Sequence, residues 1–118
     1  MSTAANIAVA LVALLQAYFL VLEMFLWDKP TGLRVFRQSL AAAQASKVLA
    51  ANQGLYNGFL AAGLVWGLLL GPAGMGVKVF FLACVLVAGL YGAATANIKI
   101  LFVQALPAAV ALALVLLS

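Results

Sequence analysis

The chain has 118 residues, 69% of them apolar and 7% charged, and it carries a formal net charge of +4. A soluble domain is about half apolar and about a quarter charged, so this composition excludes an ordinary soluble domain and indicates a protein embedded in a lipid bilayer. The sequence contains no histidine and a single cysteine, Cys84. These counts exclude Ser-His-Asp catalysis and an intrachain disulfide, and they argue against a metal site within one chain.

The first apolar run covers residues 4–27, which is enough to cross a bilayer, since a span takes about 20 residues. The run lacks a basic start and contains Glu23 near its end, so we interpret it as a membrane span and not as a signal peptide. Gln16 and Glu23 share one stripe of the predicted helix. Glu23 either reaches the membrane interface, or pairs with a lysine or arginine, or pairs with the polar side chains around Asn52.

The sequence Asp-Lys-Pro-Thr-Gly at residues 28–32 predicts the end of this helix. Residues 33–46 follow and contain Arg34 and Arg37. This stretch is either a short helix at the membrane surface or a basic loop that fixes the orientation of the chain.

The second span, residues 47–70, contains an unusual group of polar side chains for a membrane segment. On a helix they fill one arc of about 140°. Gly54 and Gly58, four positions apart, form a seam for close helix packing. The polar arc serves either helix–helix contacts or a ligand site. Its members are Asn52, Gln53, Tyr56 and Asn57.

Two further apolar runs, 75–95 and 100–117, follow a Gly-Pro turn at 71–74. Pro107 is expected to bend the last of these helices, because proline removes a backbone donor. The polar side chains in or beside these runs include Tyr91, Asn97 and Gln104.

Basic residues predict the orientation of the chain. Five of them flank the first and third connections: Lys29, Arg34, Arg37, Lys47 and Lys99. Only Lys78 lies near the second connection. The positive-inside rule therefore places both termini outside the cytoplasm. Basic residues at the ends of apolar runs act as topology signals, so we expect no nucleic-acid partner.

With this orientation, the polar groups of all four predicted spans lie in the helix halves next to the cytoplasm, which predicts one shared polar pocket. Because a buried glutamate needs donors, we expect Glu23 to lie within direct or single-water hydrogen-bond reach of Asn52, with Tyr56 completing the cluster. The candidate ligand-binding residues are Glu23, Asn52, Gln53, Tyr56, Asn57, Tyr91, Asn97 and Gln104, and the candidate rim cations are Arg34, Arg37 and Lys99.

The stretches Glu23–Trp27 and Asn52–Ala61 resemble a family of small bacterial four-helix membrane proteins known as domain of unknown function 1304. The resemblance covers the whole chain. It implies a multi-pass protein of the bacterial inner membrane, and it brings no activity with it.

A more distant resemblance links Leu14–Phe19, Asn52 with Tyr56, and Gln104–Pro107 to the membrane-associated proteins of eicosanoid and glutathione metabolism (MAPEG). It implies a trimer of four-helix subunits that binds glutathione between subunits. Leu55 stands where that family has a glutamate, and the arginines that hold the thiol are absent. The resemblance therefore supports the architecture and the place of a pocket, but not transferase chemistry.

We therefore predict an all-α, MAPEG-like four-helix membrane bundle with one transmembrane domain, 1–118, that forms a homo-oligomer, with a trimer favoured. Its pocket is expected to bind a lipophilic or anionic small molecule. Glutathione is a possible ligand by resemblance alone, and the sequence leaves open whether any reaction is catalysed. The alternatives are a proton-coupled exporter that uses Glu23 and a structural membrane subunit without a site.

Overall fold

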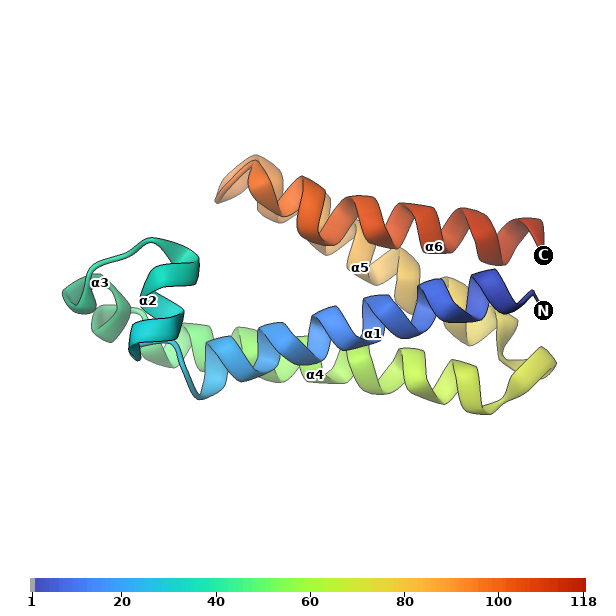
Figure 1. Cartoon of the computed structure of the whole chain (residues 1–118), viewed down its shortest axis with the longest axis horizontal. Helices are drawn as coiled ribbons and strands as arrows, with labels where there is room; N and C mark the ends of the chain where they lie inside the picture. The colour runs from blue at the N-terminus through green and yellow to red at the C-terminus, as the bar shows by residue number, and fades with distance from the viewer. Residues whose placement is uncertain (1) are drawn as a thin grey trace. The chain divides into compact units, whose positions relative to one another are not determined.

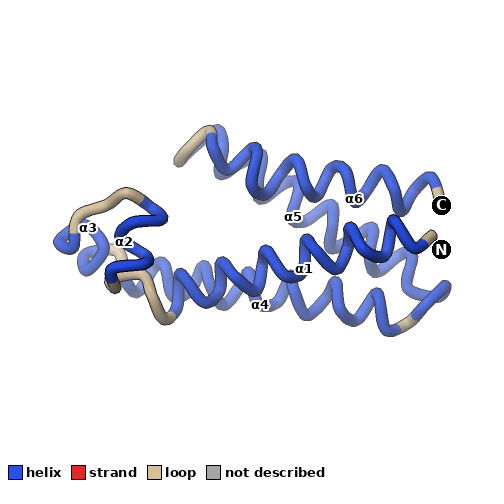
Figure 2. The backbone as a smooth tube through the Cα atoms, viewed as in Figure 1, coloured by secondary structure: helices blue, strands red, loops and turns tan. Residues whose placement is uncertain are grey.

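The computed structural model describes residues 2–118, and this part of the chain is all-α and contains no strand (Figure 1). Short loops join the helices (Figure 2). The elements in chain order are α1 (Thr3–Met24), α2 (Pro30–Phe36), α3 (Leu40–Ala45), α4 (Lys47–Leu69), the 3-10 helix η1 (Gly71–Gly74), α5 (Met75–Thr95), the π-helix η2 (Leu101–Ala105) and α6 (Leu106–Leu117).

The all-α class predicted from the sequence is confirmed, whereas the four-helix bundle is not. Six α-helices lie within residues 2–118, because the first connection folds into α2 and α3. Pro30 stands in the first turn of α2, where its missing N–H costs nothing. Ser39 caps α3 by accepting a hydrogen bond from the N–H of Ala42 at 3.1 Å.

The chain divides into two compact units. Residues 16–59 form one unit, which holds the end of α1, the helices α2 and α3, and the start of α4. Residues 2–15 and 60–118 form the other. That the chain is one transmembrane domain stays a prediction.

In the unit of residues 2–15 and 60–118, α5 and α6 lie side by side (Figure 1). Gly89 makes this contact close, since a Cβ there would lie 2.7 Å from the backbone nitrogen of Ala105. The core residues with no exposed surface include Val9, Leu64, Leu82, Val85, Ala108, Ala111 and Val115.

The predicted turn at 71–74 is the 3-10 helix η1, and it begins at Gly71 with φ of 62°, a conformation that favours glycine. The bend expected at Pro107 takes another form. The N–H of Leu106 bonds the carbonyl of Leu101, which closes the π-helix, and this wider turn runs directly into α6 just before Pro107.

Two stretches are long and apolar enough to cross a membrane: Thr3–Met24 and Gly71–Thr95. Leu101–Leu117 is a shorter apolar helix. α4 is not one of these two stretches, because the polar side chains at its start lower its mean hydropathy. Membrane association is thus indicated by length and composition.

Lys78 of α5 is buried, with 1% of its surface exposed. Its ammonium group donates to Asn6 Oδ1 at 3.1 Å. Gly67 makes room for the lysine stem, because a Cβ there would lie 2.7 Å from Lys78 Cγ. Lys78 therefore holds α1 to α5, and it does not present its charge at the surface.

Candidate functional site

A hydrogen-bonded chain of three polar side chains joins α1 to α4 within the unit of residues 16–59. Asn57 Nδ2 donates to Glu23 Oε1, and Gln16 Nε2 donates to Asn57 Oδ1 at 2.9 Å. Gln16 and Asn57 are 1% and 5% exposed, and Glu23 is half-buried. Because both ends of the Asn57 amide are engaged, its orientation is fixed between the other two residues.

Helical spacing explains how α1 supplies two members of this chain. Gln16 and Glu23 are about two helical turns apart, so their side chains lie on the same face of α1. Asn57 reaches between them from α4. We call Gln16, Glu23 and Asn57 the polar chain.

Two glycines of α4 allow the approach that the polar chain requires. A Cβ at Gly54 would lie 2.6 Å from Met24 Cγ and 3.2 Å from the Cβ of Glu23. A Cβ at Gly58 would lie 2.6 Å from a methyl carbon of Leu20. The small-residue seam predicted from the sequence therefore faces α1, where it brings Asn57 within reach of Glu23.

The structure gives Glu23 a different partner from the predicted one. Within the described residues, the hydrogen bond to Glu23 comes from Asn57 and not from Asn52 or Tyr56. Both of the latter are exposed, Tyr56 by 55%. The reason is geometric: Asn52 and Tyr56 lie about 160–200° around α4 from Gly54, which sets the side that faces α1.

Gln53 is also exposed on α4. A ligand-binding role for Asn52, Gln53 and Tyr56 stays a prediction. The sequence interpretation did not include Gln16 among the candidate site residues. The helical stripe that Gln16 shares with Glu23 was the pattern that could have identified it.

The other predicted site residues belong to the unit that contains residues 60–118. Tyr91 is 70% exposed, and Asn97 uses its side-chain oxygen to accept a bond from the Lys99 N–H at 2.9 Å. Gln104 is half-buried in η2. Their convergence with Glu23 in one pocket, and the role of Lys99 as a rim cation, stay predictions.

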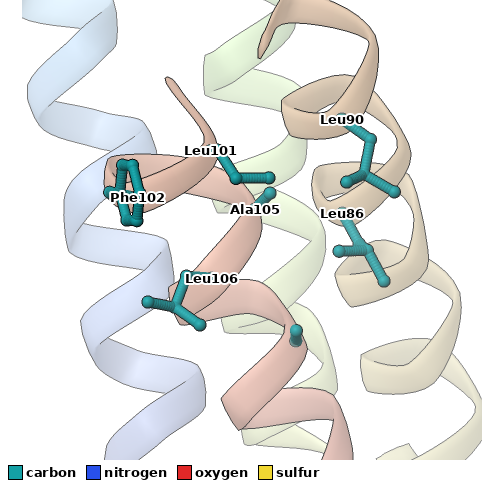
Figure 3. Close-up of a pocket in the computed structure, with 7 residues that line it drawn as sticks. Leu86, Leu90, Leu101, Phe102, Ala105 and Leu106 are labelled. Atoms are coloured by element: carbon teal, nitrogen blue, oxygen red, sulfur yellow. The ribbon is translucent and has the colours of Figure 1, made fainter. Parts of the chain in front are cut away.

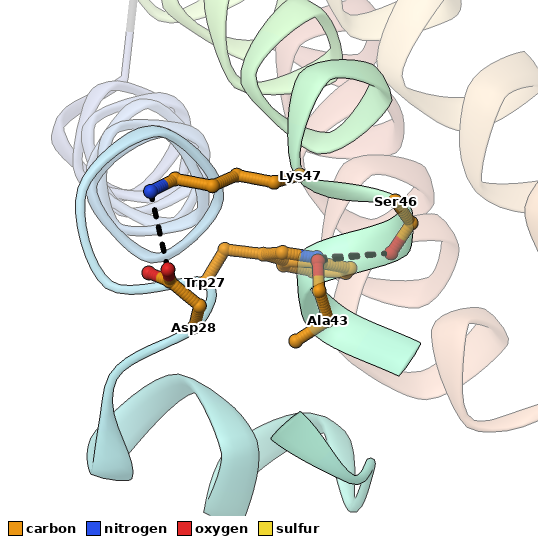
Figure 4. Close-up of polar contacts among 5 residues, drawn as sticks. All are labelled: Trp27, Asp28, Ala43, Ser46 and Lys47. Carbon is orange, nitrogen blue, oxygen red and sulfur yellow. Dashed lines mark hydrogen bonds and ion pairs between the residues drawn. The ribbon is translucent and has the colours of Figure 1, made fainter. Parts of the chain in front are cut away.

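A second polar cluster closes the connection between α1 and α4 (Figure 4). The indole N–H of Trp27 donates to Ser46 Oγ at 3.1 Å, and Ser46 Oγ donates to the carbonyl of Ala42 at 2.9 Å. Asp28 and Lys47 form an ion pair at 3.1 Å. The hydrogen bond from Lys47 holds the pKa of Asp28 below its ordinary value. These contacts fasten both ends of the α2–α3 connection.

A shallow hollow of about 230 Å³ lies on the unit of residues 60–118 between α5 and the η2–α6 segment (Figure 3). Its lining is entirely apolar and fits hydrocarbon, so it supplies no chemistry and shares no residue with the polar chain. The lining residues are Leu86, Leu90, Leu101, Phe102, Ala105, Leu106 and Ala109.

Within residues 2–118, no three histidine, cysteine, aspartate or glutamate side chains come together as metal ligands. Glu23 forms no ion pair there, since the ion pair of the described residues is that of Asp28 with Lys47. The polar chain can therefore donate and accept hydrogen bonds and hold or release one proton on its carboxyl group.

The fold and this site define an apolar, all-α protein in which a carboxyl group accepts a hydrogen bond from one amide, and that amide accepts a hydrogen bond from a second. The family model described as a protein of unknown function (DUF1304) matches residues 10–116, and the chain belongs to this family. It is 34% identical over 96 residues to the uncharacterized protein YpaA of Lactococcus lactis subsp. lactis (strain IL1403), an alignment that covers 80% of this chain and 81% of that protein. No solved structure matches the chain. The resemblance to the proteins of eicosanoid and glutathione metabolism stays a prediction.

Proposed function

We propose that this chain is an integral membrane protein that binds the polar head of a lipophilic small molecule at the polar chain of Gln16, Glu23 and Asn57. The observation that carries the proposal is the ordered bonding of three polar side chains at the contact of two apolar helices. Polar and ionisable groups are costly at membrane depth, where they commonly mark functional sites. A single amide would be enough for a polar contact between two helices, so three bonded side chains exceed what helix packing needs.

The end of the polar chain that a ligand can reach is Glu23. Gln16 and Asn57 are buried, whereas Glu23 is half-buried. A carboxyl group has room for several hydrogen bonds, and in the described residues Glu23 accepts one, from Asn57. This acceptor capacity favours a head group that donates hydrogen bonds, such as an amine or a hydroxyl. An anionic ligand would instead depend on the rim cations.

The exposed surface supports a bilayer as the surroundings of both units. Large apolar side chains are exposed on α1, α4, α5 and α6, for example Leu14 by 65%, Val48 by 77%, Val87 by 65% and Leu117 by 84%. Water would oppose such exposure, whereas lipid would not. From the apolar runs and the distribution of basic residues in the sequence, we also propose four membrane-crossing segments in the inner membrane, with both termini outside the cytoplasm.

The polar side chains left exposed on α4 support a homo-oligomer. Asn52, Gln53 and Tyr56 would face lipid in a single chain, which is unfavourable for their polar groups. A second copy packed on this side would cover them. We therefore propose a homo-oligomer, with the MAPEG-like trimer as the first arrangement to test by mass measurement in lipid nanodiscs.

The test of ligand binding is native mass spectrometry of the chain purified in mild detergent. We expect a bound small molecule with the wild type, and its loss in Glu23→Ala and Asn57→Ala. Gln44→Ala removes an exposed amide from α3, outside the polar chain and outside the proposed contact between copies, so it should keep the ligand. A folded wild type without any bound molecule, or equal binding by all four proteins, would contradict the proposal.

A proton-coupled exporter is the second candidate, and the half-buried carboxyl of Glu23 within a candidate span is the observation that favours it. An intramembrane carboxyl can exchange a proton for a ligand. Vesicles with an imposed pH gradient would then accumulate a lipophilic amine with wild type and not with Glu23→Gln. Uptake that does not depend on the pH gradient would contradict the exporter and favour the binding protein.

A further inference from the structure

Basic and apolar side chains alternate on the exposed surface of the α2–α3 connection. Lys29, Arg34 and Arg37 are exposed, and we call these three residues the basic cap. Large apolar side chains of the same segment are exposed beside them: Val35 by 46%, Phe36 by 37% and Leu40 by 49%. A short segment with basic and large apolar side chains side by side is typical of chains that lie at a membrane–water interface.

The charge of the basic cap is not neutralised by ion pairs. Within the described residues, the Asp28 carboxylate pairs with Lys47, and Glu23 bonds to Asn57. No ion pair to Lys29, Arg34 or Arg37 forms there. The three neighbouring cations therefore give this end of the unit a positive surface that attracts anions.

The basic cap is held in place by packing against the end of α1. The rings of Trp27 and Phe36 lie 4.7 Å apart between centroids, and the Trp27 indole N–H bonds to Ser46. Gly32 touches the turn after α1 so closely that a Cβ would lie 1.9 Å from the Leu26 carbonyl oxygen. α2 is thus fastened beside Trp27, a residue type enriched at the membrane–water interface.

Arg37 occupies a backbone position that usually belongs to glycine. It ends α2 with φ of 51° and ψ of 51°, and its N–H bonds to the carbonyl of Leu33. This left-handed conformation is less favourable for arginine than for glycine. The turn holds the exposed Arg37 side chain at the end of α2.

We propose that the basic cap binds the phosphate head groups of anionic phospholipids in the leaflet around the end of α1, while Val35, Phe36 and Leu40 enter its acyl region. The inference rests on the membrane insertion proposed above, and it adds a lipid preference to it. A juxtamembrane basic segment is attracted to anionic lipid, and the interleaved apolar side chains distinguish this partner from a soluble anion.

The test uses Trp27 as a reporter of the lipids beside it. The chain has two tryptophans, so Trp66→Phe leaves Trp27 as the single tryptophan. The protein is reconstituted in equal mixtures of phosphatidylglycerol and phosphatidylcholine, with bromine, a quencher, on the chains of one lipid or the other. Arg34→Gln with Arg37→Gln removes two charges, and Arg34→Lys with Arg37→Lys keeps them as the matched control.

We expect brominated phosphatidylglycerol to quench Trp27 with an apparent affinity on the order of threefold or more above that of brominated phosphatidylcholine. The preference should fall to about one in the glutamine variant, persist in the lysine variant and weaken at high salt. Equal quenching of Trp27 by both lipids in the protein with an unchanged basic cap would overturn this inference alone. An absence of quenching by either lipid would overturn membrane insertion and this inference together.

Discussion

Asn57 donates a hydrogen bond to the carboxyl group of Glu23 across 34 positions of sequence, and the same amide accepts a bond from Gln16. The one carboxyl group within the apolar helices is therefore hydrogen-bonded to a residue of α4. This arrangement also makes Asn57 the residue on which the other two depend, because its loss leaves both without this partner.

Replacing Asn57 should therefore destabilise the protein. In Asn57→Ala, two buried or half-buried polar groups lose a partner, so we expect a loss of about 1–3 kcal/mol in the free energy of unfolding. Gln44→Ala, which removes an exposed amide from α3, should change it by less than about 0.5 kcal/mol. Denaturant titration in detergent measures both. Equal, small effects would show that the hydrogen bond to Glu23 contributes little.

The close contact of α4 with α1 should make Gly54 intolerant of a larger residue. Gly54→Ala puts a methyl group 2.6 Å from Met24 Cγ and 3.2 Å from the carbonyl oxygen of Leu20, so the Met24 side chain must move and the backbone of α1 must shift slightly. We expect a destabilisation of about 1–3 kcal/mol. Gly76→Ala meets nothing within 4 Å on α5, so it should be neutral or slightly stabilising. Thermal unfolding of the two variants compares them, and a harmless Gly54→Ala would argue against close packing.

The sequence predicted the long helices but not all of their ends. The apolar runs and the turn at 71–74 can be recognised in the sequence, and the long helices occupy these runs because apolar segments long enough to cross a bilayer favour helix. The first helix ends at Met24 and not at 27, since the backbone turns there to let Gly32 pack under Leu26. No local pattern indicates that contact.

The partner of Glu23 could not be chosen from the sequence for a similar reason. Asn52 and Asn57 lie on one arc of α4, and periodicity alone does not say which edge of the arc faces α1. The packing of Gly54 and Gly58 decides it, and this required the position of the neighbouring helix. A shared pocket depends on how separate parts of the chain pack, and a ligand is another molecule. The periodicity of the sequence predicts neither of them.

Burial of Lys78 sharpens the predicted orientation. This lysine bonds to Asn6 inside its unit, so no exposed basic residue flanks the second connection, at 71–74. We expect a reporter active only in the cytoplasm to give no signal when fused after Ser118 and a strong signal when fused after Ser46. The reverse pattern would place the basic cap and the half-buried end of the polar chain on the other side of the membrane.

The ion pair of Asp28 with Lys47 should make stability depend on pH in the acid range. Because the folded-state pKa of Asp28 is lowered, its contribution is fully present above the unfolded-state value of about 3.9. It is lost as the pH falls through the lower folded-state pKa. The wild type should therefore exceed Asp28→Asn in unfolding free energy near neutral pH, and the difference should shrink at a pH of about 2.5. A difference that does not change with pH would contradict the pairing.

The central claim is that the polar chain is a binding site and not a helix contact alone. The most direct measurement is the mass of the purified wild type, Asn57→Ala and Gln44→Ala proteins under native conditions, with oligomeric state recorded in the same spectra. We predict a bound small molecule with a hydrogen-bond-donating head group on the wild type and Gln44→Ala, and none on Asn57→Ala at equal oligomeric state. A molecule retained by Asn57→Ala, or lost only from Gln44→Ala, would contradict this claim.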